Sequence, residues 1–161
     1  MYLNLAVSII KLYRYKMGTE FTFTAAALAT IISAATSATV TLYINRTNKM
    51  KYLDDQLDSL LKLALQYPHL ENPNFIKTWN DNKNSEKDEY LRYDIYCHLL
   101  FNFFSRLAAY YKYDKKKIDN YIAAKEWIRS HKDYWLNPVD SFENVDSYDK
   151  KFKQLISEYL N

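Results

Sequence analysis

The sequence predicts an all-α fold, with one N-terminal transmembrane helix followed by a small cytoplasmic helical bundle. The first observation is a long uncharged run at residues 21–45, FTFTAAALATIISAATSATVTLYIN. The second is that the chain has a single glycine, Gly18, and three prolines. The Asn-Gly and Asp-Gly pairs that are typical of β-hairpins are absent. The third is that apolar side chains after residue 46 recur at helical spacing.

Residues 21–45 have the length that a membrane anchor needs. As an α-helix they extend about 37 Å at ~1.5 Å per residue, and a bilayer has a hydrocarbon core of about 30 Å. In lipid a lone helix satisfies its own backbone hydrogen bonds, so the prediction is a transmembrane helix. Two alternatives remain open. One is a cleaved signal peptide, because Lys11 and Arg14 precede the run and Thr36-Ser37-Ala38 resembles a cleavage site. The other is a buried helix of a soluble protein.

One face of the predicted anchor carries small side chains at every fourth position, namely Ala29, Ser33, Ser37 and Thr41. Small residues at this spacing let two helices approach closely in a membrane. They are therefore a candidate oligomerisation face. The alternative is that an anchor rich in alanine and threonine shows this spacing by chance.

The orientation of the anchor depends on the residues before it. Basic residues lie on both sides, at positions 11, 14 and 16 and at positions 46, 49 and 51. Met17 is a second in-frame methionine, so the N-terminal extension 1–20 contains an alternative start. A start at Met17 removes the upstream basic residues and places the C-terminal part in the cytoplasm. If residues 1–16 are present, they predict a short interfacial helix. A single cysteine, Cys97, fits a reducing compartment.

After the anchor, the sequence predicts a juxtamembrane amphipathic helix (46–67) and a helical domain (68–161). Apolar residues at 50, 53, 57, 60, 64 and 67 form either a heptad seam or, as we favour, the apolar face of an ordinary helix that Pro68 ends. Within the domain we expect helices at 73–79, 88–113, 118–135 and 147–160. Asn72 is the expected cap of the first of these helices and Asp114 of the third. Loops are expected at 80–87 and 140–146, where polar residues cluster.

The central predicted helix, 88–113, carries a polar stripe of Asp94, His98 and Asn102. These residues are four apart and lie one above another. The stripe is either a polar site or, as we favour, an edge that bonds to neighbouring helices.

A second set of polar residues accompanies the many tyrosines. Tyrosine suits interfaces because it has an apolar body and a polar end. With the tyrosines, Arg92, Arg129 and Lys132 are a candidate interaction surface.

The sequence gives no catalytic residue, cofactor or metal site. Phosphate-binding loops need glycines, which residues 19–161 lack. The three histidines are isolated, without the spacing of metal ligands. Neighbouring Cys97 and His98 point about 100° apart on a helix. His131 can approach Cys97 from the next helix, but a small apolar core residue is the favoured role of Cys97. With a net charge of +3 and no basic groove, nucleic acid is not an expected partner.

Three stretches carry a resemblance: residues 60–80 (LLKLALQYPHLENPNFIKTWN), 89–104 (EYLRYDIYCHLLFNFF) and 125–138 (KEWIRSHKDYWLNP). They resemble uncharacterised families of small bacterial single-pass membrane proteins with a C-terminal helical domain. The resemblance implies an anchor followed by a helical domain in the bacterial inner membrane. These families have no assigned activity, so no catalytic residue is transferred, and a stress or phage-defence role is an analogy.

Together these features predict a membrane-anchored interaction protein without catalytic activity. Its expected partners are membrane lipid and either another protein or further copies of itself. One alternative is a membrane-disrupting effector of a stress or phage-defence system, which oligomerises through its transmembrane helix. Another alternative is an enzyme with a site between the central and fourth helices, using Asp94, His98, Asn102, Arg129 and His131.

Overall fold

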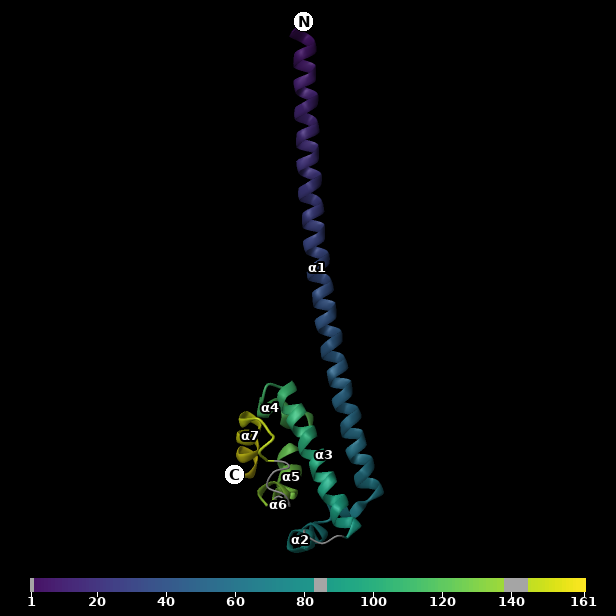
Figure 1. The fold of residues 1–161 in the computed structure, drawn as a ribbon, viewed down its shortest axis with the longest axis vertical. Helices are drawn as coiled ribbons and strands as arrows, with labels where there is room; N and C mark the ends of the chain where they lie inside the picture. The colour runs from purple at the N-terminus through teal and green to yellow at the C-terminus, as the bar shows by residue number, and fades with distance from the viewer. Residues whose placement is uncertain (1, 83–86, 138–144) are drawn as a thin grey trace. The chain divides into compact units, whose positions relative to one another are not determined.

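The computed structural model describes residues 2–82, 87–137 and 145–161 (Figure 1). All regular elements in these ranges are helices, which confirms the all-α prediction. The chain divides into two compact units, Met1–Asn48 and Lys49–Asn161. Each unit is described by itself.

The first unit is the N-terminal part of α1 (Tyr2–Gln66). Its side chains from Thr24 onward are exposed. Within the described residues, α1 is the one helix that is long and apolar enough to cross a membrane. The side chains of Phe21–Phe23 and of the apolar residues expected on an interfacial helix, Leu3, Val7, Ile10 and Tyr13, lie outside the described residues.

Threonine hydroxyls in this unit are satisfied by their own helix. Thr30, Thr36, Thr39 and Thr41 each donate to the carbonyl four residues earlier, at 2.8–2.9 Å. This bond is the usual way in which a helix accommodates threonine. In hydrocarbon it removes most of the cost of an unpaired hydroxyl. The threonine content is therefore compatible with an apolar environment.

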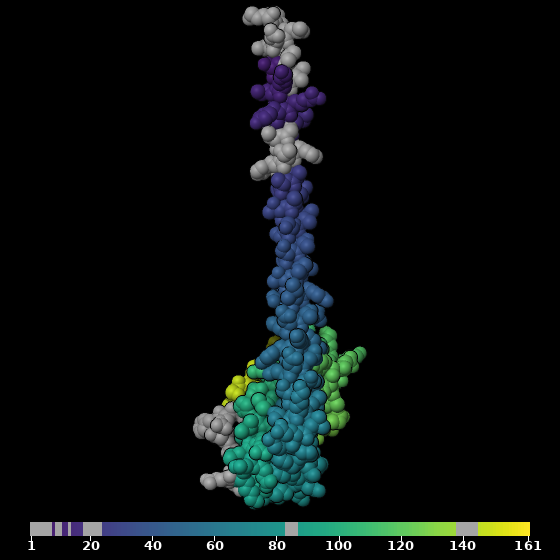
Figure 2. Space-filling model, turned by 90° about the vertical axis from the view of Figure 1, so that its right-hand side faces the viewer, coloured from purple at the N-terminus to yellow at the C-terminus, as the bar shows by residue number. Residues whose placement is uncertain are grey.

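The second unit contains the last turns of α1 and all the later helices. They are η1 (Pro68–Glu71), α2 (Pro73–Asn82), α3 (Asp88–Tyr110), α4 (Lys115–Tyr121), α5 (Ala124–Ser130), α6 (Lys132–Leu136) and α7 (Lys150–Leu160). Helix α3 supplies ten of the buried residues and is the centre of the core. Figure 2 shows the surface of the last turns of α1 beside that of α3.

The amphipathic end of α1 packs on this core. Leu53 and Leu60 are buried, and the remaining residues of the predicted face, Met50, Leu57, Ala64 and Tyr67, are partly buried against them. This confirms the interpretation of an ordinary apolar face. The helix ends at Gln66, before Pro68, as predicted.

Helix α2 is longer than predicted. Asn72 caps it, since its side-chain oxygen accepts from the amide of Asn74 at 2.9 Å, and Pro73 occupies the first turn. Burial of Ile76 and Trp79 fixes the helix on the core. It continues to Asn82, so the loop expected from Asn80 begins later than predicted. Residues 83–86 of that loop lie outside the described residues.

Helix α3 buries a wider face than predicted. The apolar face expected from the sequence is buried or, at Tyr111, partly buried; it consists of Tyr93, Cys97, Leu100, Phe101, Phe104, Leu107 and Tyr111. In addition, Tyr90, Tyr96, Phe103 and Ala108 are buried. The helix ends at Tyr110, not at Tyr113. Lys112 and Tyr113 adopt left-handed conformations with φ of 55° and 62°, and the amide of Tyr113 donates to the carbonyl of Ala108 at 2.7 Å. This contact closes the helix in the manner of a Schellman motif.

The prediction of one helix at 118–135 is wrong. The segment forms α4, α5 and α6, which are separated where Ile122 is extended (φ −153°, ψ 154°) and where His131 has φ −108°. Asp114 starts α4, as expected, by accepting from the amide of Lys117 at 3.2 Å. The breaks let short helices bend around α3, so that Ile118, Ile128, Tyr134 and Trp135 all reach the core. A straight helix would not present all of them to a curved surface.

Helix α7 begins at Lys150, three residues later than predicted. Its cap is Asp149, which accepts from the amides of Lys151 (2.9 Å) and Phe152 (3.0 Å). The predicted apolar residues Phe152, Leu155, Ile156 and Tyr159 are buried. Asn137 follows the end of α6 as expected, whereas Pro138 and residues 140–144 of the predicted loop lie outside the described residues.

Replacing the cap should lower the stability of the second unit. We expect Asp149→Ala to reduce the free energy of unfolding by about 1 kcal/mol, because two amides of α7 lose their acceptor. Denaturant unfolding followed by near-ultraviolet circular dichroism measures this. Asp146→Ala is the control, since Asp146 is exposed and makes only a long contact with Lys153 (3.5 Å). Equal losses for both variants would contradict the assignment of the cap.

Candidate functional site

Two features of the second unit stand out: a buried polar cluster around His131 and a groove between α1 and α3. The first, which we name the His131 cluster, consists of Glu71, Tyr93, Tyr96, Cys97, Trp127 and His131. The second, which we name the α1–α3 groove, is lined by Tyr52, Asp55, Gln56, Ser59, Leu60, Leu63, Leu99 and Phe103.

His131 lies between α5 and α6 and is completely buried. Its Nδ1 atom is 2.9 Å from the hydroxyl of Tyr93, and its Nε2 atom is 3.3 Å from Oε2 of Glu71. An imidazole that carries its proton on Nε2 satisfies both contacts, since it donates to the carboxylate and accepts from the tyrosine.

Glu71 connects three parts of the unit. Its Oε1 atom accepts from the hydroxyl of Tyr96 on α3 and from Nε1 of Trp127 on α5, the latter at 2.8 Å. Burial raises the pKa of the Glu71 carboxyl, but the hydrogen bonds from His131, Tyr96 and Trp127 outweigh this effect. The pKa therefore lies below its usual value of 4.5. The carboxylate stays charged and holds η1 against α3 and α5.

Cys97 is the member of the cluster with nucleophilic chemistry. Its sulfur is 3.8 Å from Nδ1 of His131, so the predicted approach of these two residues is confirmed. The side chain is completely buried, and burial raises the pKa of the thiol well above its usual value. A cysteine nucleophile needs a thiolate and access to substrate. In this arrangement Cys97 has neither and fills the core, as favoured from the sequence.

The residues of the predicted polar stripe and interaction surface have separate neighbours. Asn102 accepts from the hydroxyl of Tyr148 (3.2 Å), Arg129 donates to the carbonyl of Tyr159 (2.9 Å), and the guanidinium of Arg92 is 4.3 Å from the centre of the Tyr67 ring. Asp94 is half-buried, whereas His98 and Lys132 are exposed. Of the residues of the alternative enzyme site, Asn102, Arg129 and His131 thus bond to different partners, which are Tyr148, Tyr159 and Glu71.

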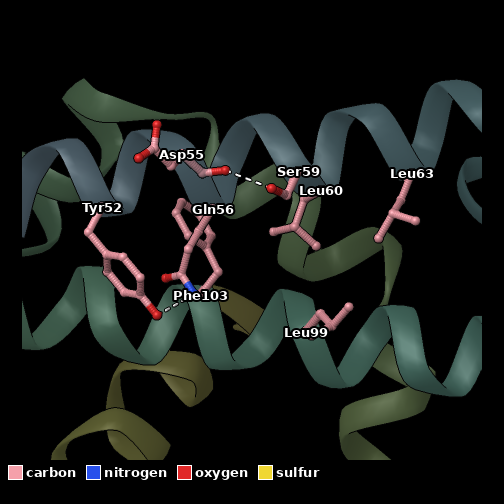
Figure 3. Close-up of a pocket in the computed structure, with 8 residues that line it drawn as sticks. All are labelled: Tyr52, Asp55, Gln56, Ser59, Leu60, Leu63, Leu99 and Phe103. Atoms are coloured by element: carbon pink, nitrogen blue, oxygen red, sulfur yellow. Dashed lines mark hydrogen bonds between the residues drawn. The ribbon is translucent and has the colours of Figure 1, made fainter.

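The α1–α3 groove has a volume of about 280 Å³. Figure 3 shows its lining side chains, which come from one face of α1 and the facing side of α3. Most of the lining is apolar. Gln56 donates to the hydroxyl of Tyr52 at 3.3 Å, while its buried carbonyl oxygen has no partner among the described residues.

A row of large apolar side chains on α3 leads to the groove. Leu91, Ile95 and Leu99 are 53%, 60% and 43% exposed, and Leu99 also lines the groove. Their spacing of four residues places them on one ridge of the helix. Sequence reasoning missed this row, because it considered only the opposite, buried face. The signal was present, since Leu91, Ile95 and Leu99 form a second apolar row at helical spacing, outside the face that was assigned to the core.

Comparisons with other proteins add no information on the site. No protein-family model, no curated protein and no solved structure matches the chain. Among the described residues, no group of three or more histidine, cysteine, aspartate or glutamate side chains has an arrangement that could hold a metal ion.

The His131 cluster should make stability depend on acidic pH. Because the pKa of Glu71 is lower in the folded chain than its usual 4.5, the carboxylate stabilises the fold above that pH. This contribution should be lost as pH falls below about 4.5 toward the folded pKa. Glu71→Gln should flatten this part of the pH profile of the unfolding free energy, whereas Glu89→Gln, at an exposed position, should not. Identical profiles for the wild type and Glu71→Gln would contradict the proposed role.

The thiol of Cys97 should be unreactive in the folded chain. We expect a water-soluble disulfide reagent to modify it only after denaturation, because the sulfur is buried and protonated. The absorbance of the released thiol product measures the rate. Rapid reaction in native conditions would show that the cluster opens and would revive the enzyme hypothesis.

Proposed function

We propose that the chain is a single-pass protein of the bacterial inner membrane, without catalytic activity of its own. Its second unit lies in the cytoplasm and binds another protein or another copy of the chain through the α1–α3 groove. The observation that carries this proposal is the groove with its adjoining row, Leu91, Ile95 and Leu99, which are exposed on a unit that otherwise has a well-buried core.

The anchor part of the proposal is supported by the composition and burial of α1. The side chains of residues 24–45 are uncharged and exposed to the surroundings. Such a surface is costly in water, at about 25 cal/mol per Å² of apolar area, and favourable in lipid. The hydroxyls of Thr30, Thr36, Thr39 and Thr41 bond to their own helix. The anchor therefore needs no neighbouring helix to satisfy them, and the small-residue face at positions 29–41 remains a prediction.

The docking part is supported by the character of the groove. Exposed apolar side chains that lie next to one another mark a surface that another molecule covers. Tyrosine, phenylalanine and leucine side chains line this one, so its surface is mostly apolar. Helical grooves of this kind bind apolar residues of a second helix.

Site-specific photocrosslinking in cells tests the docking proposal. A benzophenone amino acid at Leu99 should give a crosslinked protein product on irradiation, because this position lines the groove. The same amino acid at Leu136, which is 59% exposed on α6, is the matched control and should give much less. Equal products at both positions, or none at Leu99, would refute docking at the groove.

Extraction of the same membranes at alkaline pH tests the anchor. The protein should stay in the membrane pellet, as an integral helix does. Its release into the supernatant would refute the single-pass arrangement, whatever the crosslinking result.

A further inference from the structure

We infer that the occupant of the α1–α3 groove is a second copy of this chain, with the two copies related by a twofold axis parallel to α1 and α3 of the second unit. This inference rests on the proposed function, since it names the partner that docks at the groove. The direction of the two helices and the charges at the groove support it.

Helices α1 and α3 run antiparallel along the groove. Arg106 of α3 lies beside Tyr52 of α1, with its guanidinium donating to the hydroxyl at 3.0 Å. Arg92 of α3 lies over the ring of Tyr67. As α1 advances from residue 52 to 67, α3 therefore returns from 106 to 92. The groove has an Arg106 end and an Arg92 end, and both arginines belong to the same helix.

The Arg106 end carries two opposite charges on the two helices. Asp55 lines the groove from α1, one helical turn from Tyr52. Arg106 reaches the same end from α3. Both residues are exposed, and neither forms an ion pair among the described residues. The guanidinium has five N–H donors, of which Tyr52 takes one, so it can still bind a carboxylate.

A twofold axis parallel to the helices makes these charges complementary. With such an axis, the groove of one copy faces the groove of the other, and α1 of each copy lies opposite α3 of its partner. Residues at the same height along the groove stay at the same height in both copies. Asp55 of each copy then faces Arg106 of the other, so that the contact forms twice, as in any isologous interface. The apolar side chains, Leu63 and Leu99 among them, meet farther along the groove, toward its Arg92 end.

The alternative axis, perpendicular to the helices, is disfavoured by the same charges. It places α3 antiparallel to the partner's α3, so that Arg106 faces the partner's Arg92. Like charges at an interface are repulsive and serve to exclude a wrong pairing.

Exchange of the two charges tests this inference on the full chain in detergent micelles. The wild type should sediment as a dimer. Asp55→Arg and Arg106→Glu should each weaken the dimer by about tenfold or more, because each brings like charges together twice. A mixture of the two variants should form a heterodimer, since both contacts in it again join opposite charges. Asp58→Arg is the matched control, because Asp58 is an exposed aspartate of α1 that does not line the groove.

The mixture also separates the proposed contact from an effect on folding. A variant that is misfolded would not regain dimerisation on mixing, and circular dichroism of each variant checks the fold. Leu99→Arg is a second, independent variant at an exposed position and should abolish the dimer. A monomeric wild type, or a dimer that none of these changes affects, would overturn the inference.

Failure of this inference is distinguishable from failure of the proposed function. If the wild type is monomeric and the photocrosslinker at Leu99 captures a different protein, the groove is a docking site but the second copy is not its occupant. If Leu99 captures nothing, both fail. Capture of this chain by itself at Leu99, together with rescue on mixing, supports both.

Discussion

The compact second unit depends on the need to cover helix α3. Ten residues of this helix are buried, and six of them are tyrosine or phenylalanine. Such large rings need neighbours on several sides, because a protein interior has few voids. The last turns of α1 cover one side, and the short helices α4–α7, with α2, cover the others. The division of residues 115–136 into three helices follows from this requirement, since the chain bends around a central rod.

Aromatic packing alone does not fix how the covering segments are joined. The Glu71 carboxylate supplies this specificity, because it receives hydrogen bonds from α3, from α5 and from His131. A half-satisfied buried polar network costs more free energy than an apolar core. The arrangement of η1, α3 and α5 is therefore defined by the three hydrogen-bond donors to Glu71, which must all be present. The surrounding aromatic side chains contribute most of the buried apolar surface.

What the sequence predicts well is local. Two kinds of feature can be predicted from residue types and spacing within a single element. They are the helix caps Asn72 and Asp114 and the apolar faces of α1, α3 and α7. The breaks at Ile122 and His131 cannot be predicted in this way, because a continuous stripe at 118–135 is equally consistent with one helix. The His131 cluster was missed because Glu71, Tyr96 and Trp127 are far apart in the sequence, and only Cys97 and His131 were considered together. The exposed row on α3 was missed for the opposite reason, since its spacing was visible but the apolar residues were all assigned to the core.

The shared acceptor at Glu71 has an evolutionary consequence. One carboxylate serves Tyr96, Trp127 and His131, so the effect of losing one donor depends on which others remain. Replacements at these positions are therefore epistatic: a substitution that is harmful alone becomes tolerable once the carboxylate has gone. In related chains we expect Glu71, Tyr96, Trp127 and His131 to be replaced as a group. The aromatic residues around them should instead be replaced one at a time, with compensating changes in side-chain volume.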